Sequence, residues 1–431
     1  MKIGIIGTGI AGLSAGWYLQ KAGFDVVMFE RGPGPGISGH GIAIPGLNGD
    51  AKIDVPLRLV NGSQWPQLLE LYREIGVGIC PVDSSQSFSQ EEAETYLELD
   101  LLGQFTLDPR MLFNLKAAKI AREIKRLRTA GRQFLEAPEK KMGFIEFLQR
   151  NRFSDEFVYG FLFPVLSSTV CTCSYDALRN YPASVILRSL KKITDAESMK
   201  PGLHRVTGGV SAVADRLLHS SVTAKFGMNI NEVKKIGRKI QIEYRCGKEC
   251  DVEAFDHVVV ATQANQALNF LNQEMQAEID LLNRVRYEAV EVLLHQDSRL
   301  LPREKNEKNE KNRWATFNMI CRKSEAATCS IWLNRFLGIE SSKNWFQSIN
   351  PISEPDPELV VHRVCMERPV VDDISVDIWS SLDEMHGQPD RQIWFTGSYS
   401  TPGVPLLENG VVASKLIADR IIAIAQVTMR V

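Results

Sequence analysis

The chain has 431 residues, of which 44% are hydrophobic and 24% charged, and its formal net charge is −2. This length predicts two or three domains that bury enough apolar surface to fold without disulfides or metal. The balance of 50 basic and 52 acidic residues argues against a nucleic-acid binder, whose affinity depends on neutralising phosphates.

Cysteine usage and hydropathy give the expected compartment. The eight cysteines show no paired spacing, which predicts reduced thiols. No apolar run reaches about 18 residues, so no membrane-spanning helix is expected. Together these features predict a cytoplasmic protein.

The first thirty residues follow the pattern of a dinucleotide-binding unit. An apolar strand over 2–6 leads into the glycine pattern GxGxxG at 7–12, a helix is predicted over 11–22, and a strand over 24–29 ends at Glu30. Continuous apolar strands are typical of parallel sheets that are covered on both faces. The order strand, glycine loop, helix, strand and acid predicts dinucleotide binding.

The glycines and the acid have separate tasks in this prediction. Gly7 permits the tight turn, Gly9 lets the backbone approach a pyrophosphate, and Gly12 lets helix and strand pack closely. The N-terminal N–H groups of the helix then stabilise the phosphate charge. Glu30 can accept hydrogen bonds from ribose hydroxyls, and it disfavours NADP because it would repel a 2′-phosphate.

Later segments add the remaining parts of such a domain. They are a Gly-Gly turn that opens a helix within 201–217, an alternating hairpin at 228–233 and 239–244, a buried strand at 256–262, a strand at 393–397 and a helix at 411–425.

In this order of segments the chain resembles the flavin-containing amine oxidase and phytoene desaturase superfamily. Within it, the chain is most similar to a clade described as predicted NAD/FAD-binding flavoproteins. The resemblance covers almost the whole chain and includes 53–58, 65–77, 255–268, 294–297 and 314–318. It implies one extended FAD, with its isoalloxazine ring at a domain interface, in an FAD-dependent oxidoreductase.

The expected fold class is α/β: a Rossmann-like FAD-binding domain of the glutathione-reductase and amine-oxidase type, with a second mixed-sheet plus helical substrate domain. The FAD-binding domain is assembled discontinuously from 1–75, 200–275 and 388–431, and the substrate domain from a helical 76–199 and a mixed-sheet 276–387. Helices are predicted over 110–129, 143–150, 155–166 and 184–193, and strands over 289–296, 314–320 and 328–334. The charged, low-complexity segment 303–313 is interpreted as a solvated hairpin insertion.

The resemblance also implies cofactor contacts. They are Gly7, Gly9, Ile10, Ala11 and Gly12 at the pyrophosphate, Glu30 at the ribose, Arg31, Ser38, Gly39 and His40 after the acid, Val233 at the adenine, Gly397 and Ser398 in the C-terminal turn, and Leu406 and Leu407 at the flavin. Asp54-Val55-Pro56 departs from the family's Asp-x-Gly. Arg58 is a candidate cation near the flavin pyrimidine or a phosphate, and a structural arginine is the alternative.

The sequence identifies no catalytic residue. His204 and Tyr399 are candidates only because they lie in pocket-forming or cofactor-forming segments, with core packing as the alternative. Cys171 and Cys173 form a CxC pair without a second ligand pair, so no metal is predicted.

A basic face is predicted on the helix that follows residue 110. Its basic residues are Lys116, Lys119, Arg122, Lys125, Arg126 and Arg128, opposite Leu112, Leu115, Ala118 and Leu127. We interpret it as a solvated face, with peripheral contact to an anionic membrane as the alternative.

The predicted reaction is hydride transfer from a hydrophobic small molecule to flavin N5, as in C–C dehydrogenation, with O2 or another electron acceptor. Amine oxidation and a non-catalytic FAD- or NAD-binding protein are the alternatives. The substrate, the acceptor and a homo-oligomeric state are left open.

Overall fold

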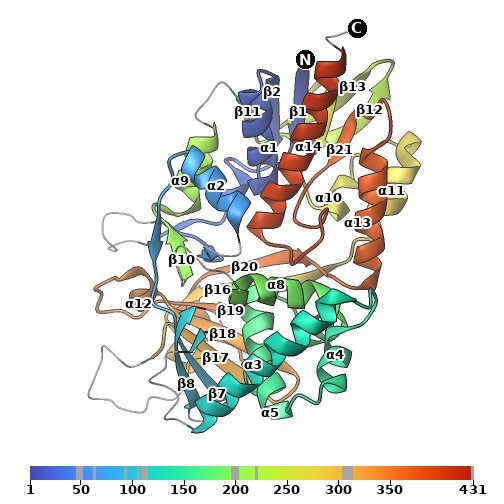
Figure 1. The fold of residues 1–431 in the computed structure, drawn as a ribbon. Helices are drawn as coiled ribbons and strands as arrows, with labels where there is room; N and C mark the ends of the chain where they lie inside the picture. The colour runs from blue at the N-terminus through green and yellow to red at the C-terminus, as the bar shows by residue number, and fades with distance from the viewer. Residues whose placement is uncertain are drawn as a thin grey trace.

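The computed structural model describes residues 1–44, 52–61, 65–91, 95–103, 106–107, 115–195, 203–218, 222–302 and 314–428. These residues form two bodies, one around a five-stranded sheet and one around an eight-stranded sheet (Figure 1). The predicted insertion 303–313 lies outside the described residues.

The five-stranded sheet is parallel throughout. Its strands, in spatial order, are β11 (Thr223–Phe226), β2 (Asp25–Glu30), β1 (Lys2–Ile6), β15 (His257–Val260) and β21 (Ile393–Phe395). All residues of β15 are buried because both faces of the sheet are covered. The predicted Rossmann-like sheet, assembled from distant parts of the chain, is therefore confirmed.

Helices cover one face of this sheet. They are α1 (Ile10–Lys21), α9 (Gly209–Leu218) and α14 (Leu407–Thr428). Ile3 and Ile5 of β1 share a buried cluster with Leu13 of α1 and Ile417 of α14. The C-terminal helix thus packs directly beside the helix that follows the glycine loop.

A three-stranded sheet covers the other face. It consists of β12 (Asn229–Ile236), β13 (Lys239–Cys246) and β14 (Glu249–Phe255). Gly4 of β1 accounts for the close approach, because a Cβ there would lie 2.9 Å from Ile242 Cδ1 and 3.0 Å from Phe255 Cγ. The predicted hairpin is confirmed, but the sequence did not predict β14, whose mostly exposed residues lack an apolar alternation.

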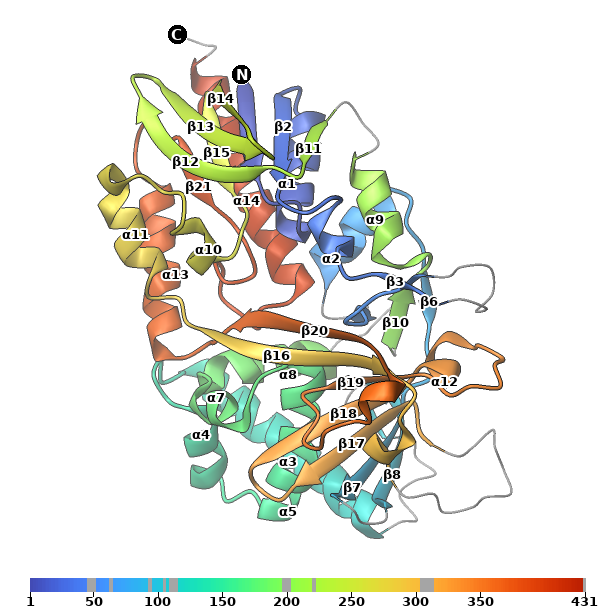
Figure 2. The same cartoon turned by 180° about the vertical axis from the view of Figure 1, so that it is seen from behind.

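Part of the segment 276–387 also packs on the five-stranded sheet. Its helices α11 (Gln276–Leu282) and α13 (Asp373–His386) lie with α10 (Ala264–Ala267) at the β15–β21 side of that sheet (Figure 2). Ile378 and Leu382 of α13 share a buried cluster with Val258 and Phe395.

The eight-stranded sheet is mixed. Its order is β20 (Val360–Pro369), β16 (Tyr287–His295), β19 (Phe346–Ile349), β18 (Ala326–Trp332), β17 (Phe317–Arg322), β7 (Ser85–Gln90), β8 (Thr95–Gly103) and β9 (Thr106–Leu107). Only β17 and β7 pair in parallel among these neighbours. Strands β16, β17 and β18 confirm the three predicted strands, with ends shifted by about two residues.

Helices pack against this sheet. They are α3 (Leu115–Glu136), α4 (Phe144–Arg150), α5 (Asp155–Phe157), α6 (Phe163–Val165), α7 (Tyr175–Asn180) and α8 (Ala183–Asp195). The predicted helix over 155–166 is confirmed, with π-helical turns at Val158–Leu162 and Leu166–Val170.

The expectation that 76–199 is largely helical needs a correction. Strands β7 to β9 come first, and the helices begin at residue 115 in the described chain. The sequence of β7, Ser-Gln-Ser-Phe-Ser-Gln, is buried at five of its six positions. Buried polar residues give no hydrophobic alternation, so sequence periodicity could not reveal this strand.

A small antiparallel sheet lies between the two bodies. Its strand order is β5 (Leu59–Asn61), β10 (Leu203–Val206) and β6 (Ile79–Pro81). Helix α2 (Pro66–Glu74) and the short antiparallel pair of β3 (Ile42–Ala43) and β4 (Lys52–Ile53) lie next to this sheet (Figure 2).

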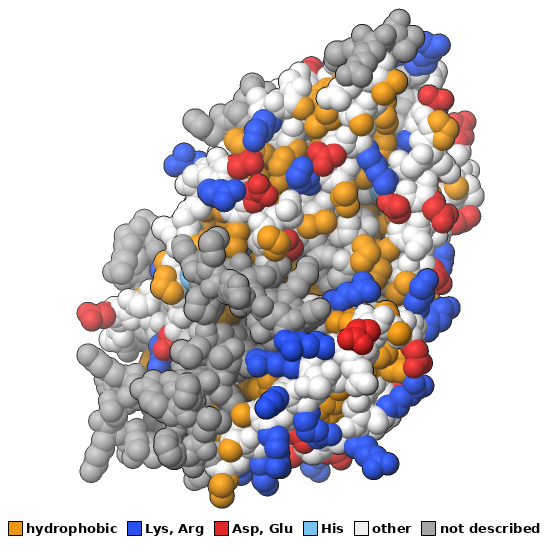
Figure 3. Space-filling view, viewed as in Figure 1, with side chains coloured by type: hydrophobic (Ala, Val, Ile, Leu, Met, Phe, Trp, Pro, Cys, Tyr) orange, Lys and Arg blue, Asp and Glu red, His pale blue; other side chains and the backbone are white. Residues whose placement is uncertain are grey.

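The predicted basic residues of α3 are exposed, except for the half-buried Arg128. The opposite face differs from its prediction, because Ala117, Ile120, Ile124 and Leu127 are among its buried residues whereas Leu115 is 82% exposed. Basic side chains gather on the surface over the lower part of the molecule (Figure 3). Among the described helices, none combines the length and the hydropathy needed to cross a bilayer.

Candidate functional site

The glycine loop joins β1 to α1. Gly7 has a φ of +98°, which favours glycine, and a Cβ at Gly12 would overlap the carbonyl oxygen of Gly7. A Cβ at Gly9 would have no heavy atom within 4 Å. The loop therefore packs tightly at Gly7 and Gly12 and leaves open space at Gly9, at the N-terminus of α1.

Glu30 is held at the end of β2 by the glycine loop. Its Oε2 accepts hydrogen bonds from Thr8 N (3.0 Å) and Thr8 Oγ1 (2.6 Å), and its Oε1 accepts one from Gly32 N (2.9 Å). Each carboxylate oxygen can accept about two hydrogen bonds, so Oε1 keeps an open acceptor position. The carboxylate is thus fixed in orientation and can accept from a further hydroxyl.

The segment after Glu30 folds back over the glycine loop. Gly36 N donates to Thr8 Oγ1 (2.8 Å), and Ile37 N donates to the carbonyl of Thr8 (3.1 Å). The predicted contacts Arg31, Gly39 and His40 are exposed here. The pKa of His40 is lowered by burial and by the charges of His362 and Arg58, which places these three residues in one neighbourhood.

The C-terminal helix contacts the same loop from the opposite end of the chain. Ser414 Oγ lies 2.6 Å from the carbonyl oxygen of Ala11, and a Cβ at Gly410 would lie 2.9 Å from Ile10 Cγ2. Leu406 packs on the cluster of the eight-stranded sheet and Leu407 on that of the five-stranded sheet. The start of α14 therefore lies where the two bodies meet.

Gly397 and Ser398 follow β21. A Cβ at Gly397 would lie 2.9 Å from the Tyr399 ring, so the turn packs against that ring. Ser398 and Tyr399 line a small, mostly apolar pocket. Its other lining residues are Val285, Pro369, Val370, Val371, Ser375, Ile378 and Trp379.

Two of the candidate residues are part of the core. Tyr399 is buried in the cluster of Val258 and Phe395, and its carbonyl accepts from Trp379 Nε1 (2.9 Å). His204 lies on β10, the central strand of the small sheet, and is 5% exposed. No contact brings the two side chains together among the described residues, which favours the packing alternative for both.

Val233, the predicted adenine contact, is bonded through its backbone within the protein. Val233 N donates to the carbonyl of Phe270 (2.7 Å), and its carbonyl accepts from Asn272 N (3.1 Å). The carbonyl keeps a second acceptor position, and the adenine contact stays a prediction.

Asp54 has a structural task at the Gly-Gly turn. Its carboxylate accepts from Val210 N (3.1 Å), in the first turn of α9, and Gly208 and Gly209 have φ of +80° and +70°. An acid at a helix N-terminus stabilises the unpaired N–H groups and the helix dipole. Burial raises the pKa of Asp54.

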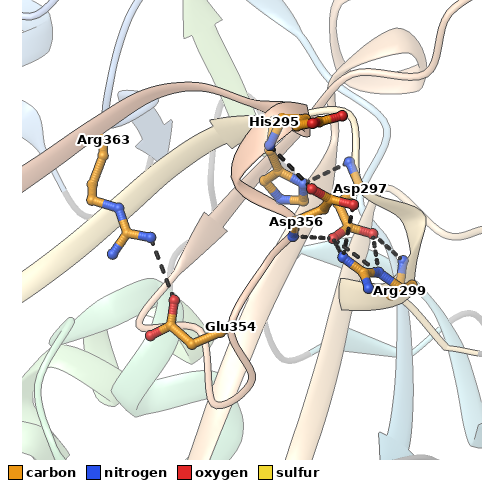
Figure 4. Close-up of polar contacts among 7 residues, drawn as sticks. His295, Asp297, Arg299, Glu354, Asp356 and Arg363 are labelled. Atoms are coloured by element: carbon orange, nitrogen blue, oxygen red, sulfur yellow. Dashed lines mark hydrogen bonds and ion pairs between the residues drawn. The ribbon is translucent and has the colours of Figure 1, made fainter.

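The sequence analysis missed a polar cluster at the end of β16 (Figure 4). His295 Nε2 lies 2.8 Å from Ser348 Oγ, and Asp297 N donates to His295 Nδ1 (3.1 Å). Ser348 Oγ lies 2.6 Å from Ser330 Oγ, which donates to the carbonyl of Leu300 (2.6 Å). The residue types Ser, His and Asp suggest a catalytic triad.

The direction of the hydrogen bonds excludes that role for the cluster. Because His295 Nδ1 accepts from a backbone N–H, its proton sits on Nε2 and is donated to Ser348. In a catalytic triad the histidine accepts the serine proton instead. Burial lowers the pKa of His295 to about 4, so the ring is neutral near pH 7.

The carboxylate of Asp297 belongs to a separate ion pair. It accepts from Arg299 Nη2 (2.7 Å) and from Asp356 N (2.8 Å) (Figure 4). Burial alone would raise its pKa, but the hydrogen bonds from Arg299 and Asp356 lower it to about 2. The cluster therefore stabilises the end of the sheet. Across the described chain, no three His, Cys, Asp or Glu side chains come together to hold a metal ion.

The residues around the glycine loop fit a dinucleotide. The open space at Gly9 meets the N-terminal N–H groups of α1, which have no acceptor within the helix. Glu30 is oriented one strand away with a free acceptor position. This set can bind a pyrophosphate and a ribose.

Comparison with known proteins agrees with this site. Residues 5–75 match the family described as NAD(P)-binding Rossmann-like domain. A stretch of 37 residues is 46% identical to a D-amino acid dehydrogenase from Rhodopseudomonas palustris (strain HaA2). That stretch is only 9% of this chain and 9% of the dehydrogenase.

Solved structures resemble the chain over nearly its whole length. The CLA-producing fatty acid isomerase from P. acnes has a TM-score of 0.68 at 14% identity and covers 97% of this chain and 98% of its own. Cyclohexylamine oxidase from Brevibacterium oxydans IH-35A has a TM-score of 0.64 at 12% identity and covers 99% of both chains. Putrescine oxidase bound to putrescine has a TM-score of 0.63 at 14% identity and covers 98% of this chain and 99% of its own.

At such identities the likeness shows the fold. The predicted α/β fold of the amine-oxidase type is confirmed.

Proposed function

We propose that the chain is an FAD-dependent oxidoreductase that takes a hydride from a hydrophobic small molecule, in a C–C dehydrogenation, and passes the electrons to O2 or another acceptor. The observation that carries this proposal is the open Gly9 at the N-terminus of α1 beside the fixed carboxylate of Glu30. The proposed FAD-binding domain comprises 1–75, 200–275 and 388–431.

The chain's residues would bind and orient the cofactor. The first-turn N–H groups of α1 would stabilise the pyrophosphate, and Glu30 would accept from the ribose. The start of α14, at Leu406 and Leu407, would position the ring between the two bodies. FAD supplies the hydride acceptor, N5 of the isoalloxazine ring.

We favour C–C over C–N oxidation because of the residues that lie near the start of α14. Neither β16 nor β20, the strands nearest the start of α14 in Figure 1, contains a lysine. Lys323, which follows β17, is exposed in the turn between β17 and β18 and so does not offer the lysine that an amine oxidase of the superfamily would place near the flavin. The amine-oxidase names of two similar structures favour the alternative, oxidation of an amine.

Flavin content tests the cofactor assignment. The purified protein should show the absorbance of oxidised flavin, and Glu30→Ala should lose most of it while keeping the fold. Glu30→Gln should retain an intermediate content because its amide oxygen still accepts. Asp25→Asn, at the exposed start of the same strand, should leave the flavin content unchanged.

Anaerobic reduction tests the reaction. A hydrophobic C–C substrate should bleach the flavin, and simple alkylamines should not. Bleaching by amines alone would establish the amine oxidase, and a bound flavin that no candidate substrate reduces or perturbs would favour a non-catalytic protein.

A further inference from the structure

Two half-buried arginines lie where the start of α14, β20 and the segment after β4 meet. We call Arg58 and Arg368 the arginine pair. In the part of the chain that the structure describes, neither guanidinium forms an ion pair with a carboxylate within 4.0 Å. This distinguishes them from Arg363, which lies on the other face of β20 and pairs with Glu354 (Figure 4). Arg363 also pairs with Glu291.

Arg368 is held only by neutral acceptors. Its Nη2 donates to the carbonyls of Cys171 (3.2 Å) and Pro405 (2.9 Å), and its buried Nε has no hydrogen-bond partner. Glu288 lies opposite Arg368 on β16, but its carboxylate accepts from Ser174 N (3.0 Å) and forms no ion pair with Arg368 within 4.0 Å among the described residues. Two other acidic groups near Arg368 carry no charge near pH 7. A hydrogen bond with Cys171 and burial raise the pKa of Cys173, and burial raises that of Tyr181.

Arg58 has even fewer partners. No hydrogen bond of its side chain is found among the described residues, and burial together with the charge of Arg368 lowers its pKa. The nearest carboxylate, Asp54, is engaged with Val210 N at the start of α9. The charge of Arg58 also acts on Tyr72, whose buried hydroxyl has no hydrogen-bond partner among the described residues.

An unpaired charge that is partly removed from water is unfavourable, and two like charges add repulsion. The neighbouring side chains do not relieve this cost, since Leu57, Val404 and Leu406 belong to the apolar cluster of the eight-stranded sheet. A ligand that brings negative charge and accepts from guanidinium, Nε–H and phenol donors would relieve it.

We propose that the arginine pair binds the carboxylate of the substrate, which is therefore an apolar carboxylic acid. This inference rests on the proposed function and specifies its substrate class. The carboxylate satisfies the free donors of Arg58, Arg368 and Tyr72, and the acyl chain contacts the apolar surroundings. Arg58 is thereby assigned to the substrate rather than to the FAD.

Binding of decanoate to the purified protein tests this site. Isothermal titration calorimetry on wild type is compared with Arg58→Met, Arg58→Lys and Arg368→Met, and with Arg363→Met as the matched control on the same strand. Each charged hydrogen bond lost should weaken binding at least about tenfold. Arg58→Lys should lose less than Arg58→Met, and Arg363→Met should bind decanoate like wild type.

Decanamide, decyl phosphate and decylamine test whether the carboxylate itself is recognised. Decanamide should bind weakly to wild type and equally to all variants. Since Arg58→Met removes a charge but no observed hydrogen bond, its unfolding temperature should not fall. Equal decanoate binding by wild type and Arg58→Met, or a preference for decyl phosphate or decylamine, would overturn the proposal.

The two proposals fail separately. Absence of flavin from the purified protein would refute the proposed function, whereas calorimetry reports decanoate binding whatever the flavin content. Normal flavin content with no decanoate binding would refute only the carboxylate site.

Discussion

Gly9 and Gly12 lie three residues apart in one loop but face different surroundings. Gly9 has φ −66° and ψ 179°, an extended conformation open to any residue, and faces open space. Gly12 faces the carbonyl of Gly7, where even a methyl group would overlap backbone. Position 9 thus has room for a side chain in the protein alone, whereas glycine is required at position 12 for the loop to pack.

Substitution should separate these two tasks. Gly9→Val should fold with nearly the stability of wild type but lose flavin, because its side chain occupies the space for the pyrophosphate. Gly12→Ala should be destabilised by roughly 1–3 kcal/mol, as expected for overpacking. Urea unfolding and flavin absorbance measure the two effects.

Gly34→Ala provides the control, since a Cβ there meets no heavy atom within 4 Å. It should match wild type in both measurements. Full flavin occupancy in Gly9→Val would show that the pyrophosphate lies elsewhere.

At the scale of elements, the eight-stranded sheet depends on a neutral histidine. His295 ends β16 and connects it to β19 through Ser348. A protonated ring would have a donor at Nδ1 facing the N–H of Asp297, so the bond would be lost.

This arrangement predicts a loss of stability in mild acid. The pKa of His295 is about 4 in the folded protein, against an ordinary value of 6.5. The unfolded chain therefore takes up the proton first, and stability present above pH 6.5 is lost as the pH falls toward 4. The free energy of unfolding should fall by about 1.4 kcal/mol per pH unit in this window, which amounts to about 2 kcal/mol between pH 7 and pH 5.

Urea unfolding of wild type and His295→Gln at pH 7 and pH 5 measures how much His295 contributes to this pH dependence of stability. The variant should be less stable at pH 7 but should lose about 2 kcal/mol less between the two pH values. Asp297, with a pKa of about 2, loses its contribution only below about pH 4, outside this window. Parallel pH dependence of both proteins would contradict the assignment of the neutral ring.

At the scale of the molecule, α14 joins segments that are far apart in sequence. Besides its contact with α1, its buried Glu408 accepts from Gln67 N (3.1 Å) and Leu68 N (2.7 Å) in the first turn of α2. The C-terminal helix thus caps a helix that begins 341 residues earlier. Both contacts hold the wall of the proposed cofactor site.

Removal of this cap should weaken the whole FAD-binding domain. Glu408→Ala should lower the free energy of unfolding by about 1.5–3 kcal/mol, the value of hydrogen bonds to a charged group. Asp419→Ala, which removes an exposed ion pair on the same helix, should change it by less than about 1 kcal/mol. Equal effects of the two substitutions would show that the cap contributes little.

The sequence by itself determined the parts whose signal is local. The tight turn at Gly7, the apolar strands on either side of α1 and the acid at Glu30 follow from a few neighbouring residues, because glycine conformation and strand periodicity are properties of short segments. The hairpin about Gly237 and the three strands 289–334 were predictable for the same reason.

Only the tertiary structure decided what depends on distant residues. Strand β7 has no apolar alternation and is a strand because β17 and β8 pair with it. The N–H of Val233 is taken by the carbonyl of Phe270, and Arg368 donates to the carbonyl of Cys171, 197 residues earlier in the chain. Burial and charge pairing are set by segments hundreds of residues apart, which no local pattern of the sequence records.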